Sequence, residues 1–343
     1  TFIKIKHSYG IDFTNNISLR IALALHCIPL IIRIKYNMQI HNESLADVRR
    51  KFPLGFEIAQ YFTFLLREKY AIDEKINEDE IALIAAHFYG SVLELQQKTR
   101  RTKVLVISAL KMSMTVLLRS VLMQWFSQEI SELDFSHAND VSEEMLDKYD
   151  VFLTTEKNEV YDNGLAMYIN SFPNDNDRKN IKLLLDGFSN LDDVIQIFQK
   201  DLFFAKEQGT KDDILENLSK KAESVYHISN LYDAVLKREQ IGSTFFSRGI
   251  AIPHPIQAVS SDTFVAACIV KNPVVWDDEG HTVHIVMMIH IGKNNPRSFQ
   301  LWDYFSRIFE DETIVKDVLD SPTFENFTLR IRNLLNMRFA QSK

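Results

Sequence analysis

Cysteine is nearly absent from this sequence. Its 343 residues include only Cys27 and Cys268, which lie far apart inside apolar runs. This excludes a disulfide framework and indicates reduced thiols in a cytoplasmic protein, because disulfides persist in oxidising compartments. The sequence also has no signal peptide and no long uncharged apolar run, so we expect no membrane insertion.

Positive charge is not in excess either. The net charge of −7 argues against a nucleic-acid surface within this chain. Neither an internal repeat nor a low-complexity tract is present, and 343 residues predict two or three domains, each with its own core. The chain opens on Thr1, and its first residues resemble the middle of a domain, which is consistent with a piece of a longer protein.

The first part of the chain has helical periodicity. In residues 1–98, Asn16 can cap a helix that carries His26 on its apolar face, with Arg33 two turns further on the same side. Pro29 is expected to kink this helix or divide it. Further helices are expected over residues 44–51, over 54–70 and from a capping-box pattern at 77–80. Such helices bury their apolar faces by forming an all-α bundle.

The period changes after residue 101. Strands expected at 103–108, 130–135 and 150–155 alternate with helices at 114–126 and 142–146. This alternation predicts a parallel α/β domain over residues 102–188. Beyond it, helices are expected at 211–226, 229–240, 299–309 and 323–335, and strands at 263–270 and 283–291. These elements predict an α/β sandwich over residues 193–340.

The stretch that most clearly suggests a reactive site is Gly249–Pro255, with the sequence Gly-Ile-Ala-Ile-Pro-His-Pro. Pro253 fixes its own φ, and Pro255 keeps His254 out of the α region. Neither proline has an N–H, so the segment should lie at a sheet edge or strand exit, with the imidazole on a solvent-reachable ledge. Such an imidazole can attack phosphorus with one nitrogen while an acceptor holds the other N–H. A surface histidine in a rigid turn is the simpler alternative.

Three other histidines are candidate metal ligands. His281, His284 and His290 lie close in sequence, but on a strand only His284 and His290 share a face. No cysteine or third aligned ligand is nearby, so we expect no metal and no cofactor.

Residues Arg238-Glu239, Gly242, Thr244 and Gly249 to His254 resemble the enzyme IIA component (mannitol/fructose type) of the bacterial phosphoenolpyruvate sugar phosphotransferase system (PTS). The resemblance covers about residues 193–340. It implies that His254 accepts a phosphoryl group, with Arg238 and Thr244 in support. The second histidine of that family is missing; Arg297 lies near its expected position and can still bind a phosphoryl oxygen.

Residues His26, Pro29, Arg33, Glu80-Ile81 and His87-Phe88 resemble the PTS regulation domain of sugar-operon regulators. In that family the histidines receive phosphate from the phosphocarrier protein, and the added charge alters dimer packing. The resemblance implies that His26 and His87 are regulatory phospho-acceptors, with Arg33 in support. The alternative is that both are satisfied core histidines.

The middle domain resembles an enzyme IIB module (galactitol type) in which key motif residues are replaced. Ser108 stands at the position of its cysteine, and Lys111 at that of its glycine. An unassisted serine hydroxyl is not nucleophilic near neutral pH, and Lys111 lacks the backbone freedom that a phosphate cradle needs. We therefore expect a degenerate, chemically silent domain kept for packing or docking.

The order of the three domains resembles the C-terminal half of sugar-operon transcription activators and antiterminators of Gram-positive bacteria. It implies a dimeric regulator rather than an enzyme, with the phosphocarrier protein and PTS enzyme II components as partners and nucleic acid bound through a module outside this chain. Phosphorylation would bias the dimer between active and inactive packings. The alternatives are a genuine enzyme IIA that relays phosphate to a transporter IIB, and a virulence-type regulator of the same layout.

Overall fold

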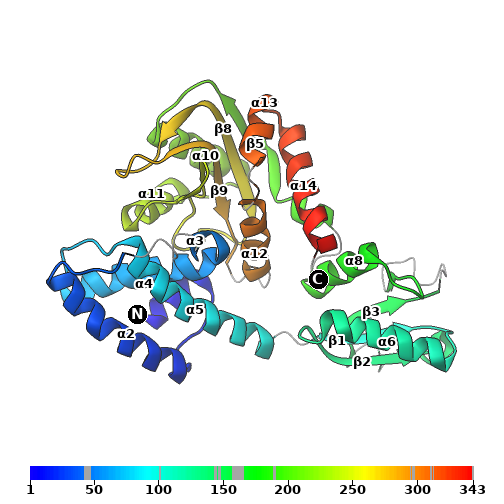
Figure 1. The fold of residues 1–343 in the computed structure, drawn as a ribbon. Coiled ribbons are helices and arrows are strands. Elements are labelled where there is room, and N and C mark those ends of the chain that lie inside the picture. Colours follow the sequence, from blue (N-terminus) through cyan, green and yellow to red (C-terminus); the bar gives the residue numbers. More distant parts are fainter. Residues whose placement is uncertain are drawn as a thin grey trace. The chain divides into compact units, whose positions relative to one another are not determined.

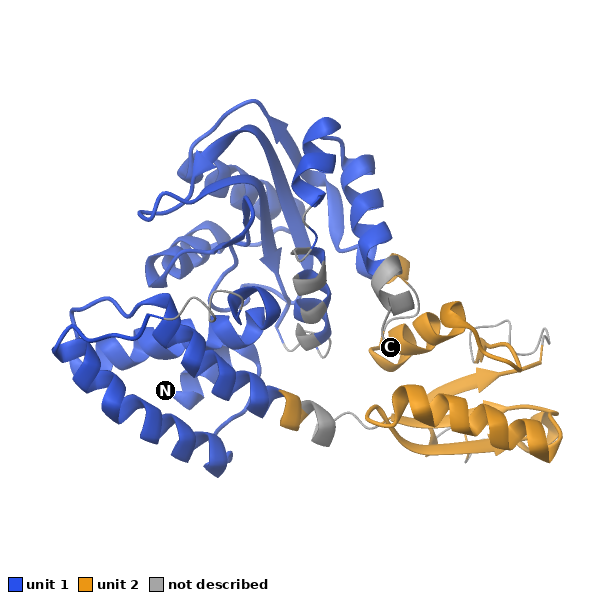
Figure 2. Ribbon diagram, viewed as in Figure 1, with its two compact units in different colours: residues 1–92, 194–335 blue, residues 93–193, 336–343 orange. Residues whose placement is uncertain are grey.

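A computed structural model describes residues 1–41, 48–99, 102–142, 145, 148–156, 166–187, 191–293, 295, 298–309, 311 and 313–341. The chain divides into two compact units (Figure 2). Unit 1 comprises residues 1–92 and 194–335, and unit 2 comprises residues 93–193 and 336–343. Unit 1 therefore contains both ends of the expected domain order, and unit 2 contains the middle.

The first part of unit 1 is helical, as expected (Figure 1). Its helices are α1 (Phe2–Tyr9), α2 (Ile17–Lys35), α3 (Val48–Lys51), α4 (Pro53–Tyr70) and α5 (Glu78–Thr99). The Asn16 side chain caps α2 by accepting a hydrogen bond from the Leu19 N–H at 2.9 Å. The helix continues through Pro29, so the expected division is wrong. The helix start expected at residues 44–47 lies outside the described residues.

The core of this helical domain, residues 1–92, is centred on Phe88. Its fully buried ring makes edge contacts with Phe2, Phe13 and Phe62, with centroids 5.4–6.5 Å apart. Helix α4 is unusual because every residue from Pro53 to Thr63 is buried. A helix buried all round packs against neighbours on more than one side. Helix α4 contacts α1 and α3 of the helical domain, and also α11 (Leu231–Ile241) and α12 (Ser298–Phe309) of the second part of unit 1.

The second part of unit 1, residues 194–335, contains a mixed sheet with strand order β5-β8-β9-β7-β6. The strands are β5 (Phe198–Lys206), β6 (Phe245–Ser247), β7 (Ile250–Ala251), β8 (Phe264–Val275) and β9 (Thr282–His290). The helices are α9 (Leu191–Ile195), α10 (Lys211–Tyr226), α11 (Leu231–Ile241), α12 (Ser298–Phe309), α13 (Ile314–Asp320) and α14 (Phe324–Gln341). Apolar residues of α10 and α11 pack on β8 and β9, and α13 also contacts these strands. This is the expected α/β sandwich.

Strand β7 positions His254. It pairs in parallel with β9 and antiparallel with β6, so it has a neighbour on each side. Gly249 enters it with a φ of +78°, a conformation that favours glycine. The Pro253 carbonyl then accepts from the Ile289 N–H at 2.9 Å. The expectation that His254 follows a strand exit is correct, but the strand is not at the sheet edge.

Unit 2 contains the expected parallel sheet, with strand order β2-β1-β3-β4. Its elements are β1 (Thr102–Ile107), α6 (Met112–Phe126), β2 (Ile130–Ser136), the short 3-10 helix η2 (Ala138–Asp140), β3 (Val151–Thr154), β4 (Met167–Tyr168) and α8 (Asp175–Leu185). Val104 and Val106 of β1 pack against α6 and α8, whereas Leu105 and Ile107 belong to a second cluster with Tyr149. Part of the helix expected at 142–146 lies outside the described residues.

Candidate functional site

Both ring nitrogens of His254 are engaged. Nδ1 lies 2.9 Å from the Ile252 carbonyl oxygen. A carbonyl can only accept, so Nδ1 carries a hydrogen. Nε2 lies 3.0 Å from Oε2 of Glu57 and 3.3 Å from Nε of Arg238. The bond to the Ile252 carbonyl therefore fixes the ring so that Nε2, the nitrogen that could react, faces a carboxylate and a guanidinium.

Arg238 is the centre of this cluster. Its side chain is fully buried and donates to Oε2 of Glu57 through Nε at 3.0 Å and also through Nη2. Nη2 donates to Oε1 of Gln60 at 2.5 Å, and Nη1 donates to the Gly242 carbonyl at 2.9 Å. Burial raises the pKa of Glu57, but Arg238 and His254 more than offset this and hold that pKa well below its usual range. The cluster is therefore a buried ion pair with a histidine against it.

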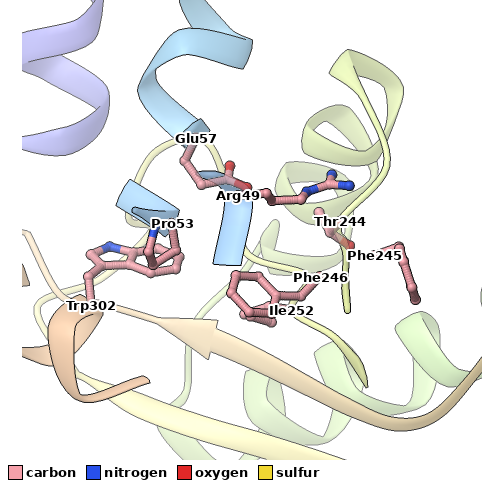
Figure 3. Close-up of a pocket in the computed structure, with 8 residues that line it drawn as sticks. All are labelled: Arg49, Pro53, Glu57, Thr244, Phe245, Phe246, Ile252 and Trp302. Atoms are coloured by element: carbon pink, nitrogen blue, oxygen red, sulfur yellow. The ribbon is translucent and has the colours of Figure 1, made fainter. Parts of the chain in front are cut away.

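The site is closed, contrary to the expectation of a solvent-reachable imidazole. His254 is only 5% exposed, with Glu57 of α4 on one side and the Trp302 ring edge-on at 5.3 Å between centroids. Figure 3 shows a pocket that includes three residues in contact with His254, namely Glu57, Ile252 and Trp302; it is also lined by Arg49, Pro53, Thr244, Phe245 and Phe246. Its free volume is about 10 Å³, roughly the room that one water molecule needs.

The other expected supporting residues of this site have different positions. Thr244 is buried and lines the pocket; its hydroxyl bonds the Glu239 carboxylate and accepts from the Trp276 indole N–H at 3.2 Å. Thr244 therefore holds the loop between α11 and β6, and none of its described hydrogen bonds reaches His254. Arg297 lies outside the described residues.

A second histidine cluster lies inside the helical domain. The ring of His26 on α2 contacts the ring of His87 on α5, with centroids 5.5 Å apart. Arg33 binds the fully buried Glu80 carboxylate with two hydrogen bonds of 2.6 Å, and the Ile40 N–H donates to the same carboxylate at 3.1 Å. The residues named from the sequence thus come together.

The His26–Glu80 contact is loose. Nε2 of His26 lies 4.0 Å from Glu80, is buried, and has no hydrogen-bond partner among the described residues. Burial and the neighbouring His87 lower the pKa of His26. The Glu80 carboxylate offsets this lowering only in part. Asn77 caps α5 by accepting from the Glu80 N–H at 3.0 Å, but the Glu80 side chain binds Arg33 rather than completing the expected capping box.

Ser108 follows β1 in unit 2. It is buried, and its hydroxyl lies 2.7 Å from that of Thr155 and accepts from the Leu110 N–H at 3.1 Å. The hydroxyl is therefore a bridge between backbone segments. Lys111, the residue before α6, is exposed and has an ordinary φ of −65°.

His284, His290 and the two cysteines have only structural contacts among the interactions described. His290 contacts the Asp262 carbonyl at 2.8 Å and accepts from the Val259 N–H at 3.0 Å. His284 contacts the Val270 carbonyl at 3.0 Å. Across the described part of the chain, no group of three or more His, Cys, Asp or Glu side chains could hold a metal ion. Cys27 and Cys268 are free and buried, and burial raises the pKa of each to about 11.

Sequence reasoning missed Glu57, Gln60 and Trp302. Glu57 and Gln60 are polar residues one turn apart in the otherwise largely apolar stretch of α4. Charged residues are almost never fully buried without a partner, so a glutamate in such a helix was a detectable signal. Its partner Arg238 lies 181 residues away in the sequence, and no local pattern indicates that pairing.

The two parts of unit 1 match two family models. Residues 196–333 match the model of the phosphoenolpyruvate-dependent sugar phosphotransferase system, EIIA 2, and residues 2–91 match the PRD domain. The chain thus contains one stretch that matches the PRD domain and one that matches the EIIA 2 model. The resemblance expected from the sequence is confirmed for these two stretches.

The chain is also similar to a Bacillus subtilis (strain 168) protein named "Probable licABCH operon regulator". The two are 23% identical over 313 residues, which cover 90% of this chain and 48% of that protein. The chain therefore spans about half the length of this relative.

Solved structures are similar to part of the chain. A chain from the complex of enzyme IIAMTL and phosphorylated enzyme IIBMTL of Escherichia coli is 16% identical, with a TM-score of 0.35, and the match covers 40% of this chain and 99% of that one. The nitrogen regulatory protein IIA-Ntr of Neisseria meningitidis is 19% identical, with a TM-score of 0.36, and the match covers 41% and 98%.

Proposed function

We propose that this chain is the sugar-responsive sensor part of a transcription regulator, whose activity is set by PTS phosphorylation of His254, His26 and His87. The observation that carries the proposal is the fixed ring of His254. Its Nδ1–H is bound by the Ile252 carbonyl, so Nε2 is the nitrogen left for phosphorus, and the guanidinium of Arg238 lies 3.3 Å away.

The phosphoryl group passes directly from the imidazole of the donor to the imidazole of His254. The lone pair of Nε2 of His254 attacks phosphorus, and the P–N bond of the phosphohistidine donor breaks, its electron pair returning to the donor nitrogen. A donor ring protonated on its other nitrogen leaves as neutral imidazole. The ring of His254 becomes a phosphoimidazolium, which keeps its Nδ1–H on the Ile252 carbonyl. Arg238 stabilises the phosphoryl oxygens by charge-assisted hydrogen bonds.

We assign His26 and His87 the regulatory role. They lie in contact, beside the bidentate pair of Arg33 and Glu80, so a phosphoryl group on either ring adds up to about two negative charges against a buried carboxylate. Such a charge change repacks the helical domain, and Arg33 is the cation placed to follow it.

We propose that the regulator acts as a homodimer. Exposed apolar residues run along one side of α2: Ile17, Ile21, Leu25, Ile28 and Ile32. The spacing of three and four residues gives a continuous stripe, and a second copy can cover it. Helix α2 is also long and apolar enough to cross a membrane, but five of its residues belong to the helical core, so we assign the chain to the cytoplasm.

The domain organisation follows from the same assignments. We propose a PTS regulation domain at 1–98, a degenerate enzyme IIB-like domain at 102–188 and an enzyme IIA-like domain at 193–340. The hydrogen-bonded Ser108 hydroxyl supports a silent middle domain. The net charge of −7 supports assigning any nucleic-acid contact to a part of the regulator outside this chain. The PTS partners are the phosphocarrier protein and enzyme II components.

The test is phosphorylation with purified components. The chain is incubated with phosphoenolpyruvate, enzyme I and phosphocarrier protein, and acid-labile label is located by peptide mass spectrometry. We expect label on His254 and on at least one of His26 and His87, lost at each site in the matching His→Ala variant. Label that chases rapidly from His254 onto a separate IIB would favour the alternative of a working enzyme IIA. A chain without histidine label would refute the proposal.

A further inference from the structure

Helix α4 of the helical domain covers the nitrogen that the proposed chemistry uses. Glu57 projects from α4, and its Oε2 lies 3.0 Å from Nε2 of His254. When Nε2 carries a hydrogen it donates to Glu57, and without one it accepts from Arg238 at 3.3 Å. In the first form Nε2 has no lone pair to attack phosphorus, and in the second the lone pair is engaged by Arg238.

The Glu57 carboxylate also uses the cation that a phosphoryl group needs. Oε2 accepts from two nitrogens of Arg238, at 3.0 Å from Nε and by a short bond from Nη2. A guanidinium recognises carboxylate and phosphoryl oxygens through the same pair of donors. Glu57 is thus an anion bound against Nε2 by the residue that would bind the phosphoryl oxygens.

The surroundings of His254 leave no room for both groups. The pocket that Glu57, Ile252 and Trp302 help to line leaves about 10 Å³, which suits one water molecule and not a phosphorus with three oxygens. At Nε2 itself, Oε2 of Glu57 lies 3.0 Å away and His254 is only 5% exposed. A dianion placed there would also lie against a buried carboxylate, and like charges at this distance repel strongly. The phosphoryl group and Glu57 therefore exclude each other.

The consequence extends beyond one side chain, because other bonds link the same two domains. Gln60 accepts from Arg238 at 2.5 Å, and Arg49 of α3 donates to the Ser243 carbonyl at 2.5 Å. Arg49 is 8% exposed, so this contact is well shielded from water. Loss of the Glu57 contact removes the central link of this interface.

We propose that Glu57 is a built-in substitute for the phosphoryl group: α4 docks on the face of His254 in the unphosphorylated chain, and phosphorylation of His254 expels Glu57 and releases the helical domain. The inference rests on the proposed function, because it assumes that His254 accepts phosphate. It adds a partner, the chain's own α4, that competes with the phosphocarrier protein for this face.

The test compares Glu57→Gln with Glu68→Gln in the full chain. Glu68 is an exposed residue of the same helix and serves as the matched control. Gln keeps the shape of Glu57 but removes its negative charge. That charge binds Arg238 and would repel a phosphoryl group on His254. With phosphoenolpyruvate, enzyme I and phosphocarrier protein, we expect His254 of E57Q to be labelled roughly tenfold faster than in wild type, and E68Q to match wild type.

A second measurement needs no variant. Deuterium exchange of peptides from α4 is compared in the wild-type chain before and after labelling of His254, and we expect exchange to rise on labelling. Equal labelling rates of E57Q and wild type, together with unchanged exchange of α4 in labelled protein, would overturn the inference and leave the proposed function standing. No label on His254 even in E57Q would refute the proposed function and the inference together.

Discussion

Replacement of Glu80 by glutamine should destabilise unit 1 strongly. The Glu80 carboxylate is fully buried and accepts two bonds of 2.6 Å from Arg33 and one of 3.1 Å from the Ile40 N–H. Glutamine keeps the size but cannot accept on both terminal atoms, so the Arg33 guanidinium, 20% exposed, loses half of its partner. Removing one charge of a buried pair costs about 3–5 kcal/mol, and the partial exposure of Arg33 places this case near the lower value, about 3 kcal/mol.

The pH dependence of this effect has a definite sign. Burial raises the pKa of Glu80, but the bonds from Arg33 and Ile40 outweigh it and lower that pKa below its usual value. A depressed folded pKa stabilises the folded state above the unfolded pKa, about 4.3 for glutamate, and this stability is lost as the pH falls through the folded value. The difference between wild type and E80Q should therefore be full at about pH 7 and shrink toward about pH 3.

Urea unfolding measures both quantities. The chain has three tryptophans, of which Trp125 is in unit 2, so a Trp125→Phe background leaves fluorescence from unit 1 alone. The control is Glu74→Gln, an exposed position expected to change stability by less than about 0.5 kcal/mol. A loss below about 1 kcal/mol in E80Q at neutral pH, or a loss that does not change on acidification, would refute the reasoning.

Three further outcomes are expected. Ser108→Ala should leave histidine labelling unchanged and lower the stability of unit 2 by about 1 kcal/mol, since it removes one buried hydroxyl bridge; reduced labelling would contradict a silent domain. Burial lowers the pKa of His26, so unit 1 should lose stability as the pH falls below the unfolded value of about 6.5, and His26→Gln should flatten this part of the urea–pH curve. Phe88→Ala should cost about 3–5 kcal/mol in urea unfolding, because its ring fills the centre of the helical core; a loss under about 1 kcal/mol would show that the core collapses around it.

Local signals in the sequence predicted most elements. Asn16 and Asn77 cap helices where their side chains indicated. These predictions succeed because a cap depends on atoms only a few residues apart.

Strand β5 shows where local signals end. Its burial does not alternate, and its pairing with β8 shifts register between Phe198 and Phe203. The period-two pattern that identifies a half-buried strand is therefore missing. Strands β6 and β7 have only three and two residues, too few for any period to show.

The sequence predicted His254 and Arg238 of the candidate site, but not the residues that close it, Glu57, Gln60 and Trp302. The rigid backbone around His254 follows from the neighbouring prolines, but its burial depends on α4, which is distant in sequence. Likewise, the spacing of His26 and Arg33 placed them on one side of a helix, whereas the distance to Glu80 is a tertiary property. Residue types and local geometry follow from neighbouring residues in the sequence, whereas contacts between domains depend on the whole fold.

Both histidine clusters place a histidine beside a buried glutamate that an arginine binds. They differ in whether the glutamate and the arginine belong to the same domain. Glu80 and Arg33 both belong to the helical domain, so displacing this carboxylate rearranges packing inside one bundle. Glu57 and Arg238 belong to different domains of unit 1, so displacing that carboxylate breaks an interface. The same charge change should therefore alter the shape of the helical domain at one site and its association with the EIIA domain at the other, and two PTS signals on one chain can have distinct outputs.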